Sequence, residues 1–291
     1  MRVPDSLFPP TLVVVLLGLL ASIGWGFGDF GGGLTSRRAP ALGVLGGSQL
    51  ASLLVGLVLL TVVSEPAMRP EDVAVSIAGG VFGSAGLALL YRGLAAGRMG
   101  VVAPIAAVLT AGLPVAFGFL TEGLPSEVAV LGIAFAVVSV ILVSRAPDAG
   151  DGRPSGLPYA LGAGTLFGLF TISASFLPDE LILSPLLVIR ATSIAVITAW
   201  LLARPQAWRV PRGLWPAVVG VGVLDMAATA AYLGAIAIGP LSIAAILTSL
   251  YPVVTVILAA AVLRERITPA HAAGIAAAGL AVALIAGAPV R

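Results

Sequence analysis

The 291-residue chain contains no cysteine and no lysine, and its single histidine is His271. Without cysteine there is no disulfide, no thiolate nucleophile and no cysteine-ligated metal. One histidine cannot form a histidine metal cluster, and no convincing Ser-His-Asp arrangement can be assembled around it. The sequence therefore predicts no catalytic residue, no metal site and no cofactor, and we expect a protein that is not an enzyme.

Charged residues are also scarce. They make up 10% of the chain, against about 25% in a soluble domain, whereas 59% of residues are hydrophobic and the mean hydropathy is +1.12. The apolar runs are long and unbroken, unlike the short alternating strands of a barrel. The sequence therefore predicts an all-α integral membrane protein. Although the pI is about 9.5, the arginines stand singly or in pairs between apolar segments, so we expect no nucleic-acid partner.

Ten apolar segments approach the roughly 20 residues that a helix needs to cross the hydrocarbon core. The first follows a polar lead at residues 1–10 and has no clear cleavage site, which favours a membrane helix over a signal peptide. The predicted helices cover about residues 11–33, 41–63, 73–96, 99–121, 127–144, 157–177, 184–203, 213–238, 240–263 and 269–288.

The two halves of the chain repeat one pattern. Both carry a Tyr-x-Gly, a proline at the centre of the next helix and a glutamate just past that helix: Tyr91 and Tyr232, Pro114 and Pro252, Glu122 and Glu265. We interpret the prolines and glutamates as repeat-matched structural residues; the prolines favour kinks, which can be static or can serve a moving helix. The predicted organisation is a five-helix repeat at 1–145, a linker at 146–158 and a second five-helix repeat at 159–291.

Five helices per repeat is an odd number, so the two repeats must cross the membrane in opposite senses, as inverted repeats. Eleven arginines lie in or beside the odd-numbered loops, and three lie in the termini and even-numbered loops. Because positive residues favour the cytoplasmic side, we expect the odd loops to be cytoplasmic and both termini external, in the cytoplasmic (inner) membrane.

Charged residues inside the spans are costly in lipid and therefore mark candidate functional positions. Asp225 lies near the centre of its helix, where it either makes a packing hydrogen bond or faces a polar cavity. Arg190 either snorkels to the surface or lines the cavity, paired with an anion. Asp29 lies nearer a helix end. The candidate residues for substrate binding or coupling are Asp225, Arg190, Asp29, Trp25, Gln49, Tyr91, Tyr232, Thr248 and Tyr251.

Glycine is abundant, with 36 residues, mostly within the predicted helices. Small residues four apart allow helix backbones to approach closely in lipid. Such pairs include Gly24 with Gly28 and Gly164 with Gly168. The spacing predicts helix–helix contacts at these positions.

Two segments resemble a known family. GPLSIAAILTSLYPVVTVILAAAVLRERITPAHAAGIAAAGLAVALIAG, residues 239–287, is similar to the hairpin that closes the EamA-type domain of the drug/metabolite transporter superfamily. GRMGVVAPIAAVLTAGLPVAFGFLTEGLPSEVAVLGIAFAVVSVILVS, residues 97–144, resembles the same hairpin in a first domain. The pair Trp25–Gly26 also resembles the family, with Phe167–Gly168 in its place in the second half. The resemblance covers nearly the whole chain as two tandem domains.

The resemblance implies a ten-helix secondary transporter in which helices one to four and six to nine surround a central cavity while five and ten are peripheral. Substrates across the family include amino acids, other metabolites, nucleotide sugars and drugs. We therefore predict a carrier that moves a small metabolite or drug-like solute across the membrane by alternating access. The expected partners are this solute and membrane lipid, and a homodimer is compatible with the sequence.

The main alternative is a membrane-embedded enzyme acting on a lipid-linked substrate. Such enzymes need clustered acids or a positioned nucleophile, whereas the acids within these spans are isolated. A scaffolding protein is a third class, but the inverted repeat has no purpose there. The chain has no GxxxxGK[ST] motif, so an ATP-driven pump is not encoded in it and a gradient is the expected energy source.

Overall fold

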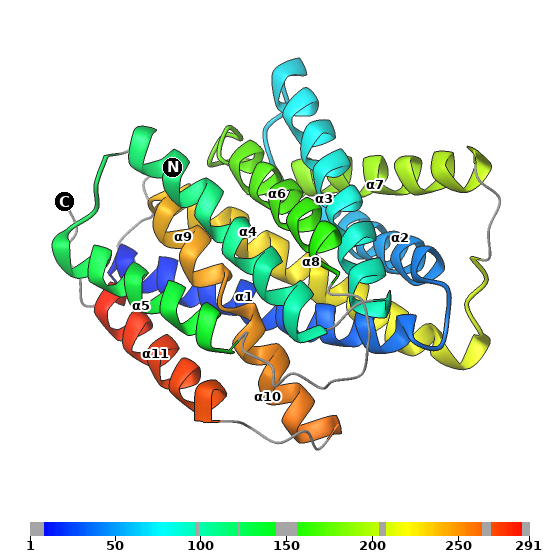
Figure 1. The fold of residues 1–291 in the computed structure, drawn as a ribbon. Coiled ribbons are helices and arrows are strands. Elements are labelled where there is room, and N and C mark those ends of the chain that lie inside the picture. The colour runs from blue at the N-terminus through cyan, green and yellow to red at the C-terminus, as the bar shows by residue number, and fades with distance from the viewer. Residues whose placement is uncertain are drawn as a thin grey trace.

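A computed structural model describes residues 9–96, 99–121, 123–143, 156–203, 208–263 and 269–286. Throughout these ranges the secondary structure is helical, without strands (Figure 1). The helices are α1 (Pro10–Ser36), α2 (Ala41–Leu60), α3 (Pro70–Ala96), α4 (Met99–Thr121), α5 (Glu127–Val143), α6 (Leu157–Ala174), α7 (Leu183–Ala203), the short 3₁₀ helix η1 (Arg212–Leu214), α8 (Trp215–Ile238), α9 (Leu241–Thr248), α10 (Tyr251–Leu263) and α11 (Pro269–Ala286).

Prolines mark the starts of most helices. They occupy the first or second helical position of some and the N-cap of others: Pro10, Pro70, Pro158, Pro216 and Pro269 in the first turn, Pro40 and Pro240 at the cap. The first helical N–H groups have no partner within the helix, so a residue without an N–H is tolerated there, and the fixed φ of proline suits the first turn. The same residue type therefore sets helix boundaries in both halves.

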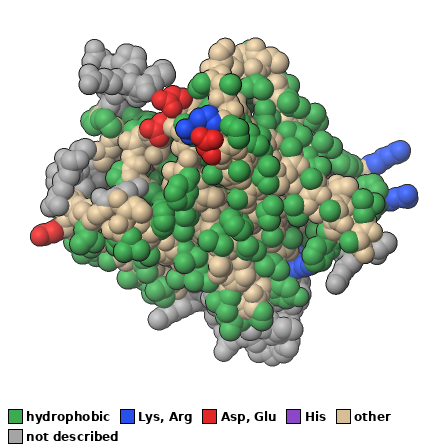
Figure 2. Space-filling view, turned by 90° about the horizontal axis from the view of Figure 1, so that it is seen from above, with side chains coloured by type: hydrophobic (Ala, Val, Ile, Leu, Met, Phe, Trp, Pro, Cys, Tyr) green, Lys and Arg blue, Asp and Glu red, His purple; other side chains and the backbone are tan. Residues whose placement is uncertain are grey.

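The helices belong to an integral membrane protein. Six segments of the described chain are long and apolar enough to cross a membrane by length and composition: α1, α2, α3, α6, α7 and Arg212–Ile238, which joins η1 to α8. The remaining apolar helices are shorter. Large side chains such as Leu54, Val58 and Leu202 are exposed, and Figure 2 shows a mostly hydrophobic face with charge confined to a few places. Such a surface suits lipid.

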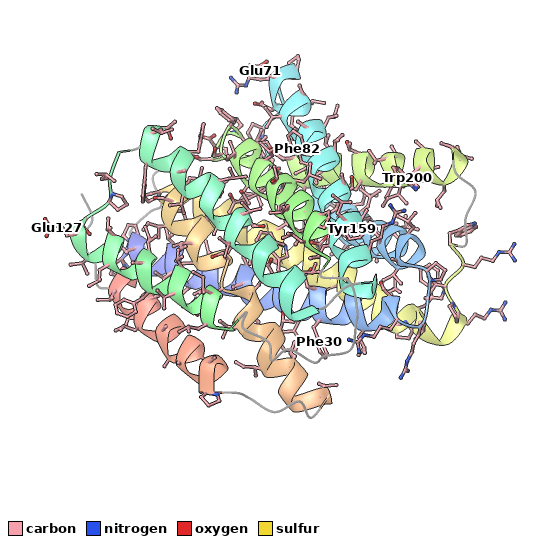
Figure 3. The ribbon with its side chains drawn as sticks, in the orientation of Figure 1. Phe30, Glu71, Phe82, Glu127, Tyr159 and Trp200 are labelled. Atoms are coloured by element: carbon pink, nitrogen blue, oxygen red, sulfur yellow. The ribbon has the colours of Figure 1, made fainter. Side chains whose placement is uncertain are left out.

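Charged side chains gather near helix ends. Figure 3 shows Glu71 and Glu127 projecting from the first turns of α3 and α5, away from the bundle. Arg69 precedes α3, and its guanidinium lies 2.9 Å from Asp72 and 3.3 Å from Glu71. Acidic residues in a first turn complement the positive end of the helix dipole.

The predicted helix at 240–263 is instead two helices. α9 ends at Thr248 and α10 begins at Tyr251, with Ser249 and Leu250 between them. Pro252 has no N–H to donate to the carbonyl of Thr248. The Leu250 and Val253 N–H groups instead donate three residues back, to Leu247 and Leu250, at 3.3 and 3.0 Å. The matched helix α4 continues through the buried Pro114 without a break, so only one of the two prolines divides its span.

Some predicted features lie outside the described residues. These are Glu122, Glu265 and residues 146–155, which form most of the predicted linker. After the linker, Gly156 has a φ of +71° and immediately precedes α6. That left-handed conformation favours glycine, so Gly156 fixes where the second set of helices begins.

The glycine prediction holds at some positions and is wrong at Gly28. A Cβ at Gly24 would lie 2.7 Å from the Cβ of Ala228, and one at Gly164 would lie 2.6 Å from the carbonyl oxygen of Ala106. A Cβ at Gly28 would meet nothing within 4 Å. The spacing of small residues identifies a face of a helix, but the neighbouring helix covers only part of that face.

Most large contacts join helices of different halves. α1 packs on α8, α3 on α6, α4 on α6, α1 on α9 and α10, α2 on α8, α3 on α7, and α2 on α7. α5 packs along α11 at one edge of the bundle (Figure 1). The core is therefore shared between the halves, and the space at its centre is bordered by both.

One side chain joins the two halves at the start of α7. The carboxylate of Glu65, in the α2–α3 connection, accepts hydrogen bonds from the N–H groups of Ile182, Leu183 and Ser184 at 3.0, 2.7 and 2.8 Å. These are N–H groups at the start of α7, which the helix itself leaves unpaired. Burial opposes the ionisation of Glu65. The hydrogen bonds from the backbone together have a larger effect than burial, so the pKa of Glu65 is lowered below the usual 4.5.

Glu65→Gln is expected to lower the free energy of unfolding by about 1–2 kcal/mol at pH 7, because it removes a negative charge from a helix N-terminus and one acceptor oxygen. Because the pKa of Glu65 is lowered in the folded protein, its contribution to stability is fully present above pH 4.5, the usual pKa of glutamate. This contribution is lost as the pH falls through the pKa of Glu65 in the folded protein. The difference between wild type and variant should therefore shrink below pH 4.5. Thermal unfolding in detergent from pH 7 to pH 3 measures it. Glu71→Gln, at an exposed side chain, is the control; equal melting of all three proteins at pH 7 contradicts the capping role.

Candidate functional site

A cavity lies at the centre of the bundle. Its empty space amounts to about 640 Å³, and this figure includes space that is open to solvent. α1, α2, α3, α4, α6, α7, α8 and α10 supply its walls, and no described side chain of α5 or α11 contributes to them. The resemblance implied such an arrangement, with the fifth and tenth spans peripheral. The lining residues are Trp25, Asp29, Gln49, Gly83, Leu87, Thr110, Phe167, Phe170, Thr171, Ile189, Arg190, Ser193, Asp225, Thr229 and Tyr251.

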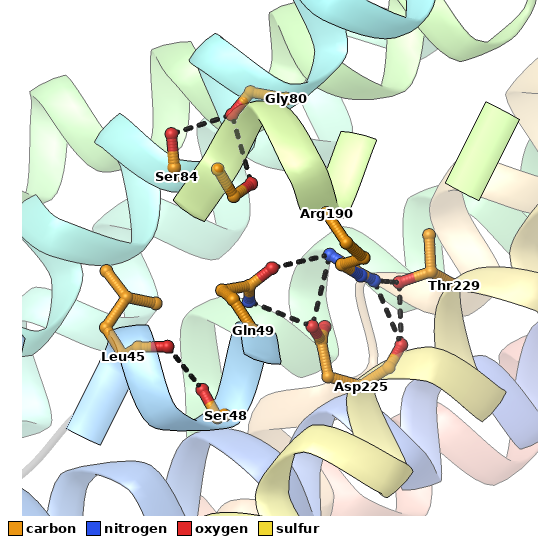
Figure 4. Close-up of polar contacts among 9 residues, drawn as sticks. Leu45, Ser48, Gln49, Gly80, Ser84, Arg190, Asp225 and Thr229 are labelled. Atoms are coloured by element: carbon orange, nitrogen blue, oxygen red, sulfur yellow. Dashed lines mark hydrogen bonds and ion pairs between the residues drawn. The ribbon is translucent and has the colours of Figure 1, made fainter. Parts of the chain in front are cut away.

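An ion pair forms part of the cavity wall. Nη1 of Arg190, on α7, lies 3.2 Å from Oδ2 of Asp225, on α8 (Figure 4). The Arg190 side chain is 5% exposed and that of Asp225 is 15% exposed. Arg190 therefore does not snorkel to the lipid surface; it points inward and is neutralised by the carboxylate. Because the surrounding helices are apolar, each of the two charges depends on the other for stabilisation.

Two neutral side chains extend the ion pair into a network. Gln49, on α2, donates from Nε2 to Oδ2 of Asp225 at 3.2 Å and accepts from Nη1 of Arg190 at 3.3 Å. Thr229, one turn after Asp225, accepts from Nη2 of Arg190 at 2.7 Å and donates to the Asp225 carbonyl at 2.7 Å. The network thus joins α2 of the first half to α7 and α8 of the second (Figure 4).

Asp29 is the second carboxylate in the cavity wall. It lies on α1 and lines the same cavity as Asp225. Among the described residues none forms a hydrogen bond or ion pair with Asp29, and no three His, Cys, Asp or Glu residues are grouped as metal ligands would be. The cavity therefore contains a carboxyl group that no described residue pairs.

Aromatic rings cover much of the remaining wall. Trp25, Phe167, Phe170 and Tyr251 all line the cavity. Trp25 also packs on Tyr232, with ring centroids 5.7 Å apart. The wall thus combines a few polar groups with flat apolar surfaces, which is typical of a site for a small organic molecule.

Six of the nine candidate residues line the cavity: Trp25, Asp29, Gln49, Arg190, Asp225 and Tyr251. The other three do not. The Tyr232 hydroxyl donates to the Thr171 carbonyl at 3.0 Å, and the Thr248 hydroxyl donates within α9 to Ala245 at 3.0 Å. Tyr91 is buried, with its ring against Gly32 of α1. These three side chains support the wall from behind, and a binding role for any of the nine stays a prediction.

The sequence contains a signal for several wall residues that the charges alone do not reveal. Residues 141 positions apart correspond between the halves, as Tyr91 and Tyr232 do. The same offset pairs Gln49 with Arg190 and Ser84 with Asp225, and an offset of 142 pairs Asp29 with Thr171. Polar residues therefore recur at matched places on α1/α6, α2/α7 and α3/α8. By contrast, Phe170 and Ile189 carry no such signal, since apolar residues fill most positions of these helices.

The fold and cavity define an all-helical integral membrane protein with a central polar site. Residues 154–287 match the EamA-like transporter family, which agrees with the resemblance of the chain to the drug/metabolite transporter superfamily. A solved crystal structure is similar in fold, with a TM-score of 0.73, 17% sequence identity, and coverage of 93% of this chain and 95% of the other. No curated protein matches the chain in sequence.

Proposed function

We propose that the protein is a secondary transporter that moves a small solute across the cytoplasmic membrane by alternating access. The observation that carries the proposal is the cavity between the two halves, whose wall contains a charged network that links α2 to α7 and α8. Ionised groups at the centre of a membrane protein are costly, and those that are retained commonly mark a transport pathway. The alternative, a membrane-embedded enzyme acting on a lipid-linked substrate, has no observation of its own in its favour. A homodimer stays a prediction.

The pattern of helix contacts supports an inverted repeat, with α9 and α10 together forming one span. In this repeat α1, α2, α3, α4 and α5 correspond to α6, α7, α8, α9/α10 and α11, in that order. Replacing each helix by its counterpart converts the α1–α8 contact into α6–α3, the α2–α8 contact into α7–α3, and the α4–α6 contact into α9/α10–α1. The α2–α7 and α5–α11 contacts are converted into themselves. All of these pairs are among the packed helices. Inverted repeats are related by a pseudo-two-fold axis in the membrane plane, which permits two arrangements of one chain that open to opposite sides.

Corresponding connections in the two halves make corresponding contacts. The α2–α3 connection caps α7 through Glu65, and the α7–α8 connection places the carbonyl of Trp208 against Gly43 in the first turn of α2. These contacts join the two halves near the starts of α7 and α2. In the proposed cycle the solute binds to the cavity residues, and the two ends open alternately as these contacts rearrange.

The side chains of the network have distinct tasks in this cycle. Arg190 and Asp225 hold α7 against α8, and Gln49 attaches α2 to both. A solute or proton that competes for the Asp225 carboxylate would loosen the attachment of α2, which is a differential interaction of the kind that shifts a conformational equilibrium. The break between α9 and α10 precedes Tyr251 of the wall, so bending there would move a cavity residue.

Introduced cysteines test alternating access without background, because the chain has none of its own. Thr110→Cys places a thiol in the cavity wall. We expect a membrane-impermeant maleimide to label it from either side of oriented vesicles, because the cavity opens to each side in turn. Gly213→Cys, in the exposed η1, should react from one side only. Labelling of Thr110→Cys from a single side contradicts alternating access.

We further propose that both termini are external. α1 begins and α11 ends at the same end of the bundle (Figure 1), and the odd-numbered loops carry most of the arginines. Gly213 belongs to one of these loops, so Gly213→Cys should be protected in intact cells and react after the membrane is opened. Labelling of Gly213→Cys in intact cells would reverse the orientation. A reporter fused after Arg291 that is active only in the cytoplasm should stay silent.

A further inference from the structure

The charges of the cavity wall do not cancel. Two carboxylates, Asp29 and Asp225, face one guanidinium, that of Arg190. Asp225 is neutralised by Arg190 at 3.2 Å. Asp29 has no hydrogen-bond or ion-pair partner among the described residues, although it lies in the same wall. When Asp29 is ionised, the cavity therefore has an excess negative charge that a bound cation would balance.

The guanidinium of Arg190 is not available for an anionic group. Its Nη1 is bound to Asp225 and Gln49, and its Nη2 to Thr229 and the Asp225 carbonyl, the latter at 3.4 Å. Nε is buried without a partner in the described structure, so a solute cannot reach it. A carboxylate or phosphate on the solute would find no free cationic donor here and would be repelled by Asp29. The cavity wall therefore disfavours both anionic and zwitterionic solutes.

The rest of the wall suits a cation with an apolar body. Trp25 is four residues before Asp29 on α1, so the ring and the carboxylate share one face of the helix. Phe167 and Phe170 of α6 and Tyr251 of α10 supply further rings. Aromatic faces attract ammonium groups and accept apolar groups. A strongly hydrated metal ion would leave these rings unused.

We propose that the solute of this transporter is an organic monocation, an amine whose ammonium group binds the Asp29 carboxylate while its apolar body lies against Trp25, Phe167 and Phe170. The proposal rests on the proposed transport function and names its substrate class. Asp29 selects the charge, and the Arg190–Asp225 pair with Gln49 forms the neutral floor of the same site. The matched residue in the second half, Thr171, is uncharged, so the charge selection comes from one half only.

Four probes of one size and different charge test the inference on purified protein in nanodiscs at pH 7. They are phenethylamine, 2-phenylethanol, phenylacetate and phenylalanine: a cation, a neutral molecule, an anion and a zwitterion. By calorimetry we expect phenethylamine to bind at least about ten-fold more tightly than the other three, because only it gains an ion pair without burying a second charge. Equal or tighter binding of phenylacetate or phenylalanine overturns the proposal, as does absence of phenethylamine binding.

Variants locate the site. Asp29→Asn should lose the preference for phenethylamine over 2-phenylethanol, and Asp29→Thr, which introduces the residue type of the matched position, should behave alike if the first variant does not fold. Glu71→Gln, outside the cavity, should bind as wild type does. Retention of the preference by the Asp29 variants overturns the assignment of the ammonium to Asp29.

Flux separates this inference from the proposed function. Proteoliposomes that move no solute, although phenethylamine binds with the expected selectivity, would refute transport and leave the cation site standing. Proteoliposomes that move phenylalanine but not phenethylamine would support transport and refute the cation site.

Discussion

Asp225→Asn is expected to abolish solute flux and to lower the free energy of unfolding by about 3 kcal/mol. Asparagine keeps the shape of aspartate but not its charge, so the guanidinium of Arg190, only 5% exposed, loses its counter-charge. The value is at the lower end for a broken buried pair, because the Asp225 side chain retains 15% exposure. Asparagine also cannot ionise, so a proton-coupled step at this carboxylate would stop. Uptake by vesicles under an imposed pH gradient, with melting temperature measured alongside, gives both quantities.

The double variant Asp225→Asn/Arg190→Gln separates the structural role of the pair from its functional role. It removes both charges and places at 190 the residue type that occupies the matched position, Gln49. We expect much of the lost stability to return, because no buried charge is left unpaired, while flux stays lost. Recovery of flux together with stability would reduce the pair to a structural element. Wild-type uptake by Asp225→Asn alone would remove Asp225 from the transport cycle.

Gly222→Leu is expected to disrupt the packing of α8 on α2. A Cβ at Gly222, on α8, would collide with the carbonyl oxygen of Ser48 on α2 and lie 2.9 Å from the Cβ of Ala51. Backbone cannot rotate away as a side chain can, so the two helices must separate. We expect a loss of about 3 kcal/mol, the upper end for overpacking. Because Gln49 follows Ser48, separation would also break its bond to Asp225 and lower flux.

Gly220→Leu is the matched control on the same helix. A Cβ there would meet nothing within 4 Å, so the same substitution should change the free energy of unfolding by less than about 0.5 kcal/mol. Thermal unfolding of both variants in detergent provides the comparison. Equal losses at the two positions would mean that leucine itself, rather than the α2–α8 contact, causes the effect.

Much of the helical framework follows from hydropathy, because spans of about 20 apolar residues leave few alternatives in lipid. The duplication also points to residues that meet across the centre, since Gln49 and Arg190 occupy matched places. The break between α9 and α10 could not be predicted in the same way. Pro114 and Pro252 both lack an N–H, yet α4 accommodates its proline and the second span does not.

Hydropathy alone does not predict which side chains face the cavity. Asp29 looked close to a helix end, but α1 continues to Ser36, which leaves Asp29 inside the helix and in the cavity wall. Tyr91 and Tyr232 looked like wall residues, whereas both are buried behind the wall. Side-chain direction depends on helix rotation about its axis, and helices that are apolar all round give no amphipathic signal to fix it.

The most direct test of the account is saturable flux. Proteoliposomes containing the wild-type protein are loaded with a mixture of amines, amino acids and nucleosides, a pH gradient is imposed, and efflux is followed by mass spectrometry against protein-free and Asp225→Asn liposomes. The account predicts that at least one solute leaves faster from wild-type liposomes, with a rate that saturates, and that the Asp225→Asn protein loses this flux. Equal efflux of every solute from all three preparations would contradict it.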